Sequence, residues 1–190
     1  MKVIITVVCF TLICSLVKGQ TIEWYSESEN NGVIIQNSFN RGGPYAGPAK
    51  EYFNISHLVY FTRVNNDTQN PLELTVNFSA DSIAIPNSHD TFVKLFLLPD
   101  TMTLDKPKLF GYGEIELESF YQSTKFHRKL NPKEDCLFYV VALFYQIRDG
   151  EWSQTRGGNR AELVLKGQDL FYRMPPQIDS LHCGHIIFSK

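Results

Sequence analysis

The longest nearly unbroken apolar run beyond the N-terminus extends from Cys136 to Ile147. It is rich in β-branched and aromatic residues and follows a turn-forming sequence around Pro132, which is typical of a buried strand. Both alternating sets of side chains in this run are apolar, one at positions 138, 140, 142 and 144, the other at 137, 139, 141, 143 and 145. We therefore predict a central strand that is covered on both faces.

Shorter segments of similar character predict the other strands. Leu72, Leu74, Val76 and Phe78 alternate with polar residues, which indicates one buried and one solvent-exposed face. Segment 41–48 holds three glycines and two prolines and is predicted to be a loop. The pattern is weakest over 101–128, where we expect short or irregular pieces. Further strands are predicted at 22–25, 33–39, 58–64, 92–98, 161–166 and 170–174.

Seven or eight strands with turn signals at short intervals predict an all-β fold, an antiparallel β-sandwich, rather than a βαβ arrangement. The sequence from Leu130 to Val140 resembles the corner leading into strand F of immunoglobulin-like and fibronectin type III-like domains, with its leucine, proline, acidic turn and aromatic strand. The resemblance implies an immunoglobulin-like architecture and no particular function. The tyrosine of that corner is replaced here by Phe138 or, in the fibronectin spacing, by Cys136.

The N-terminus has the layout of a secretory signal. Residues 1–19 combine the basic Lys2, an apolar stretch and small residues before Gln20, so we predict cleavage after Gly19 and a secreted or periplasmic protein. The apolar stretch is shorter than the ~20 residues of a spanning helix, although an uncleaved anchor is the alternative. The mature chain, residues 20–190, is predicted to form one domain without a membrane span. Its composition resembles that of exported bacterial proteins.

Charge and cysteine content narrow the classes of partner. The net charge of −2 becomes −4 once Lys2 and Lys18 leave with the signal, so no nucleic-acid partner is expected. Cys9 and Cys14 also leave, and the remaining pair, Cys136 and Cys183, is predicted to form a disulfide in an oxidising compartment. Two buried free cysteines are the alternative.

The sequence shows no catalytic motif. Neither a Gly-x-Ser-x-Gly elbow nor a His-Glu-x-x-His helix is present. The cluster from His182 to His185 includes Cys183 and suggests zinc binding or a Cys–His dyad. Because the usual paired-ligand spacing is absent and Cys183 is assigned to the disulfide, we expect no metal, no cofactor and no catalytic residues.

Two loops hold the candidate binding residues. Residues 148–160 include Trp152 and Arg156, and the predicted loop at 41–48 includes Arg41 and Tyr45. If both loops reach the same end of the sandwich, the four side chains would form a recognition surface for a protein or a glycan at the cell surface. The alternative is that Trp152 folds back onto the core.

The favoured hypothesis is therefore a non-catalytic binding module. A secreted hydrolase acting on carbohydrate or peptide and a structural component of a cell-surface assembly are the alternatives. Glycosylation sequons begin at Asn54, Asn66 and Asn77, and their use depends on the host. The oligomeric state is not predicted.

Overall fold

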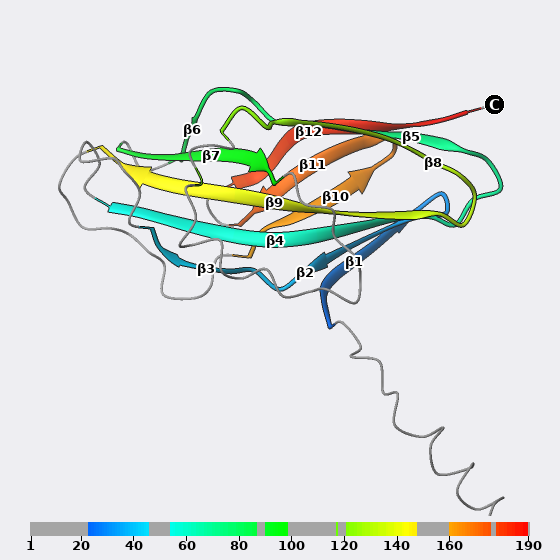
Figure 1. The fold of residues 1–190 in the computed structure, drawn as a ribbon, viewed down its shortest axis with the longest axis horizontal. Helices are drawn as coiled ribbons and strands as arrows, with labels where there is room; N and C mark the ends of the chain where they lie inside the picture. The colour runs from blue at the N-terminus through cyan, green and yellow to red at the C-terminus, as the bar shows by residue number, and fades with distance from the viewer. Residues whose placement is uncertain are drawn as a thin grey trace, which may run out of the picture.

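A computed structural model describes residues 23–45, 54–86, 90–98, 117, 121–147, 160–175 and 178–189. These residues form two antiparallel sheets that pack face to face (Figure 1), which confirms the all-β sandwich. Within these ranges the structure has twelve strands, rather than the seven or eight predicted. None of the residues described belongs to a helix able to cross a membrane. The strands are β1 (Trp24–Asn30), β2 (Val33–Ser38), β3 (Arg41–Pro44), β4 (Asn54–Asn66), β5 (Leu72–Asn77), β6 (Ile83–Ala84), β7 (Thr91–Leu97), β8 (Lys125–Leu130), β9 (Asp135–Gln146), β10 (Glu162–Lys166), β11 (Asp169–Met174) and β12 (Ile178–Phe188).

Sheet A has seven strands in the order β1-β2-β4-β9-β7-β6, and β3 continues the line of β2 along β4. Sheet B has five strands in the order β10-β11-β12-β5-β8. Strand β9, the predicted central strand, pairs over its whole length with β4 and over its second half with β7. Its central position within sheet A is therefore confirmed.

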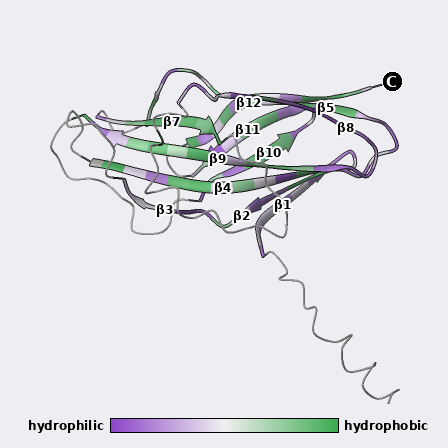
Figure 2. Cartoon of the chain, viewed as in Figure 1, coloured by the Kyte–Doolittle hydropathy of each residue, from purple (hydrophilic) through white to green (hydrophobic). Residues whose placement is uncertain are grey.

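Strand β9 is also covered on both faces, as its sequence predicted. Figure 2 shows the hydrophobic residues concentrated along β4 and β9. Phe138, Val140, Ala142 and Phe144 face the core between the sheets. Tyr139, Val141 and Leu143 lie in a second apolar cluster on the outer face of sheet A. We call this second group the outer cluster. Tyr45, Leu117 and Tyr121 also belong to it or pack against it.

Segment 41–48 is not wholly a loop, because its first four residues form β3. Glycine makes this pairing possible rather than preventing it. A Cβ on Gly42 would lie 1.9 Å from the carbonyl oxygen of His57 on β4, so only glycine permits the close approach of the two backbones. The glycines that suggested irregular structure therefore mark a tight strand contact.

The predicted corner connects the two sheets. Four residues, Asn131 to Glu134, lead from β8 in sheet B to β9 in sheet A. The fully buried Asn66 holds this corner beside another crossing, the one from β4 to β5. Its amide nitrogen donates to the carbonyl oxygens of Leu130 and Asn70. The side chain of Asn66 thus joins two of the sheet-crossing connections at one end of the sandwich.

The predicted disulfide is wrong: Cys136 and Cys183 are both free and buried. The Cys183 thiol donates to the carbonyl of Leu170, at 3.5 Å, and lies near Tyr60 in the core. Tyr60 pairs with Val140, four residues along β9 from Cys136, which corresponds to about 13 Å. Cys136 lies in sheet A and Cys183 in sheet B. Because the two cysteines are also offset along the strands by this distance, their sulfur atoms cannot form a bond.

Candidate functional site

The structure places the four predicted binding residues in different environments. Tyr45 is only 8% exposed, and its hydroxyl oxygen accepts a hydrogen bond from the backbone N–H of Leu117, at 2.9 Å. Tyr45 is therefore part of the outer cluster and not of an exposed surface. Arg41 is exposed on β3. Trp152 and Arg156 lie outside the described residues.

Three connections begin or end in one region, and one of them, 148–159, carries Trp152 and Arg156. Gln146 at the end of β9 pairs with Asn54 on one side and with Thr91 on the other. Connections 46–53, 87–89 and 148–159 therefore begin or end on three neighbouring strands at the same end of sheet A. A shared end for loops of different strands is how immunoglobulin variable domains gather their binding loops.

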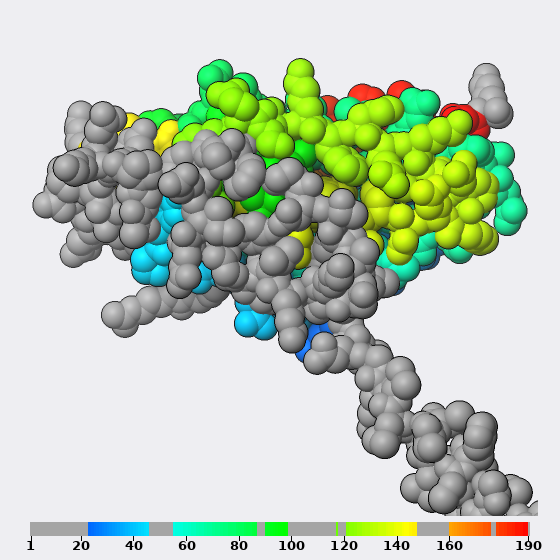
Figure 3. Space-filling view, in the orientation of Figure 1, coloured from blue at the N-terminus to red at the C-terminus, as the bar shows by residue number. Residues whose placement is uncertain are grey.

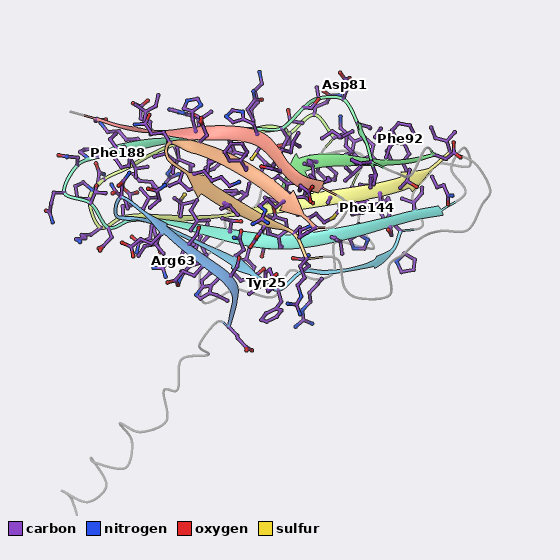
Figure 4. The ribbon with its side chains drawn as sticks, turned by 180° about the vertical axis from the view of Figure 1, so that it is seen from behind. Tyr25, Arg63, Asp81, Phe92, Phe144 and Phe188 are labelled. Carbon is purple, nitrogen blue, oxygen red and sulfur yellow. The ribbon has the colours of Figure 1, made fainter. Side chains whose placement is uncertain are left out.

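The other end of connection 148–159 leads to an exposed aromatic and arginine cluster. The guanidinium carbon of Arg160, just before β10, lies 4.9 Å from the ring centroid of Tyr25. The rings of Tyr25 and Phe39 are 5.7 Å apart and tilted by 57°. Phe39 is 45% exposed and Arg160 is also exposed. We call these three residues the Tyr25 cluster; Figure 4 shows Tyr25 beside β1 at the edge of the sandwich.

A β-bulge directs Tyr25 toward this surface. Trp24 pairs with Ser38 and Ser26 pairs with Asn37, so Tyr25 is the extra residue of β1. The ring of Trp24 packs edge-on against the ring of Phe61 in sheet A, with 5.4 Å between the ring centroids. Bulges commonly redirect a side chain in this way. Of these two adjacent aromatic residues, Trp24 therefore packs against the outer cluster and Tyr25 contributes to the surface.

A buried hydrogen-bond network holds β10 against β2. The side chain of Asn37 is 1% exposed; its amide donates to the carbonyl oxygen of Leu163 at 2.9 Å. Its own oxygen accepts from the N–H of Leu163 at 3.1 Å and from the hydroxyl of Thr62 at 2.8 Å. Because Arg160 is only three residues from Leu163, this network positions Arg160 over Tyr25.

The Tyr25 cluster is suited to binding by stacking and by charge-assisted hydrogen bonds. A guanidinium over a phenol ring gains cation–π energy of about 0.5–1 kcal/mol at an exposed site. Arg160 is exposed, and a guanidinium has five N–H donors that suit a carboxylate, a sulfate or a carbonyl oxygen. The exposed Phe39 adds apolar area that a partner would bury.

The His182–His185 cluster does not converge on a metal. Cys183 faces the core, and burial raises the pKa of its thiol to about 12, so it is not a reactive thiolate at neutral pH. The neighbouring His182 is exposed and lies 3.3 Å from a carboxylate oxygen of Asp169. Within the part of the chain that the structure describes, no three His, Cys, Asp or Glu side chains are arranged to hold a metal ion.

The sequence analysis missed the Tyr25 cluster. The available signals were the Trp24-Tyr25 pair on a short edge strand, the large apolar Phe39 between two strand segments and the arginine that ends the polar loop. Their proximity depends on the bulge and on the docking of β10, which a sequence pattern does not reveal. Comparison with models of known protein families and with curated proteins gives no match.

Proposed function

We propose that the mature chain is a non-catalytic binding module, secreted or periplasmic, that recognises a protein or a glycan at the cell surface. The contact surface is the Tyr25 cluster together with connection 148–159, which carries Trp152 and Arg156. The observation that supports this proposal most is the stack of Arg160 on Tyr25 beside the exposed Phe39.

The composition and support of the cluster agree with this role. Tyrosine, tryptophan and arginine are enriched among the residues that dominate binding energy at protein interfaces. Rigid aromatic side chains also lose little conformational entropy on binding. Tyr25 is fixed by a bulge and Arg160 by the docking of β10, so the surface is largely preorganised.

The finer architecture that we propose is immunoglobulin-like in a limited sense. Two antiparallel sheets and a sheet-crossing corner before β9 support the likeness. In the immunoglobulin order the strand after F lies beside it. Here both neighbours of β9, β4 and β7, precede it in the chain, and all later strands lie in sheet B. The likeness therefore concerns layers and corner rather than strand order.

The test begins by finding a ligand for the wild-type mature chain, on a glycan array and among envelope proteins of the native host. Dissociation constants for that ligand are then measured for Trp152→Ala and Arg160→Ala. Each substitution should weaken binding roughly tenfold, as expected for a residue worth more than 1 kcal/mol. Unchanged affinity in both variants would refute the proposed contact surface.

A further inference from the structure

Strand β8 is unusually basic for a chain with a net charge of −2. Four of its six side chains are basic and exposed, and none is acidic. We call these four residues the basic strip; they are Lys125, His127, Arg128 and Lys129. The three positive charges of Lys125, Arg128 and Lys129, close together on a protein of negative net charge, create their own attractive region for anions.

The strip lies along an edge of sheet B. Among the strands that the structure describes, β8 is the last of that sheet and pairs only with β5. The β5 residues opposite Lys125, His127 and Lys129 are Asn77, Thr75 and Glu73, and Glu73 alone is acidic. Most of the basic strip thus has no opposing charge on β5. Residues 125–130 lie in the yellow-green area at the upper right of Figure 3, which the grey atoms leave uncovered.

The charges are arranged in a line rather than around a point. Lys125 and Lys129 are four residues apart on one strand, which corresponds to about 14 Å. His127 lies between them on the same face, and Arg128 points to the other side. A single small anion would contact only part of the row formed by Lys125, His127 and Lys129, whereas an extended polyanion can contact all three side chains.

The chemistry of the strip favours a polysaccharide over two other polyanions. Single-stranded nucleic acids bind where exposed aromatic rings stack on bases. The aromatic residue of β8, Phe126, is turned inward instead, and its ring centroid lies 4.9 Å from that of Phe138. Stable membrane attachment combines basic residues with inserted apolar groups, but Leu130 is fully buried. The strip offers charge and hydrogen-bond donors alone. We infer that β8 binds an anionic polysaccharide with sulfate or carboxylate groups.

The basic strip is separate from the Tyr25 cluster. Strand β10 meets β1 and β2 at one lateral edge of the sandwich, whereas β8 approaches β7 at the opposite edge. Polysaccharide binding by β8 therefore does not depend on the proposed function of the Tyr25 cluster. Each surface can be removed by substitution while the other remains.

Calorimetric titration with heparin and with polygalacturonate, at low and at moderate salt, tests the inference. Lys125→Glu/Lys129→Glu should lower the affinity of the mature chain for at least one polysaccharide by roughly tenfold or more at low salt. It should also reduce the dependence of affinity on salt, because fewer counterions are exchanged. Lys166→Glu, which reverses one exposed charge on β10, is the control for net charge and should have a much smaller effect.

The double variant Lys125→Gln/Lys129→Gln removes two positive charges from the strip without adding negative ones, and it should show an intermediate loss. Thermal unfolding and circular dichroism of all variants verify that the fold is retained. Absence of measurable binding by the wild type, or equal loss in the Lys166→Glu control, would overturn the inference. Equally strong binding of a single-stranded oligonucleotide or of phosphatidylserine vesicles through the strip would also overturn the assignment to a polysaccharide.

Discussion

Asn37 pairs with both backbone hydrogen-bonding groups of Leu163, joining β2 of sheet A to β10 of sheet B. The paired groups belong to the edge strand of sheet B, where unpaired N–H and C=O groups would otherwise invite another strand. The same contact sets the position of Arg160 over Tyr25. One buried side chain therefore closes an edge of the sandwich and supports the candidate site.

Replacement of Asn37 by alanine should lower the free energy of unfolding by about 2–4 kcal/mol, because the two buried groups of Leu163 would lose their partners. Urea denaturation measures this change. Gln36→Ala is the matched control on the same strand, since its contacts with Glu27 and Arg63 are exposed or partly buried; it should cost less than about 1 kcal/mol. Equal losses in the two variants would contradict the assigned role.

Cys136 and Cys183 should both be free thiols in the folded protein. Burial raises the pKa values of Cys136 and Cys183 to about 12, so iodoacetamide at neutral pH should label neither in the folded protein and both in guanidinium. Mass spectrometry of peptides prepared without reductant measures this. A linked Cys136–Cys183 peptide would contradict the structure, as would a stability that falls when reductant is added.

The stability should fall on mild acidification because of His57. Burial lowers the pKa of His57 from its usual value of 6.5, so the unfolded chain takes up a proton while the folded chain stays neutral. As the pH falls below 6.5, the free energy of unfolding should decrease, by at most about 1.4 kcal/mol per pH unit from this one group. The free energy of unfolding stops decreasing on account of His57 once the pH falls below the lowered pKa of His57 in the folded protein.

Urea denaturation between pH 7.5 and 5.5 measures this dependence. In His57→Gln the part of the slope due to this group should disappear. Other groups that titrate in this range act in both proteins, so the difference between the two slopes isolates His57. Identical slopes for the wild type and the variant would show that His57 takes up its proton equally in both states.

When the protein is expressed in a glycosylating host, Asn77 should carry a glycan and Asn66 should not. Asn66 is fully buried, and its side-chain oxygen accepts from the N–H and hydroxyl of Thr68; a glycan there is incompatible with the fold. Asn77 is exposed at the end of β5. Glycopeptide mass spectrometry of the folded, secreted protein should find a glycan at Asn77 and none at Asn66.

Two substitutions separate the sequons. Ser79→Ala removes the Asn77 sequon and should remove the glycan from that position. Thr68→Ala removes the Asn66 sequon and should leave glycan content unchanged, while lowering stability through its lost hydrogen bonds. Folded protein with a glycan on Asn66 would contradict the structure. The side chain of Asn54 lies outside the described residues, so its sequon is not compared.

The sequence predicted those strands in which buried and exposed side chains alternate regularly or in which both faces are apolar. The alternation from Leu72 to Phe78 and the doubly apolar run of β9 both reflect which faces meet a core. Strand β8 was missed because an edge strand with four basic residues buries little. Strand β12 was also missed, because Gly184 interrupts its pattern, at a point where a Cβ would lie 2.0 Å from the carbonyl oxygen of Thr75.

The candidate site was less predictable because it depends on contacts between distant segments. Tyr45 looked like a loop residue, but its hydroxyl is held by the backbone of Leu117, 72 positions away. Tyr25 and Arg160 have no sequence signal that links them, since their meeting follows from the docking of β10 on β2. Tertiary packing therefore determines which aromatic residues are exposed.

The affinity of the double variant Phe39→Ala/Arg160→Ala for the ligand retained by the wild type tests the central claim most directly. Ile187→Ala is the matched control, because Ile187 on β12 is 49% exposed, close to the 45% of Phe39. Binding should weaken by roughly tenfold or more in the double variant and stay unchanged in the control. A double variant that folds and binds like the wild type would show that the Tyr25 cluster is not the contact surface.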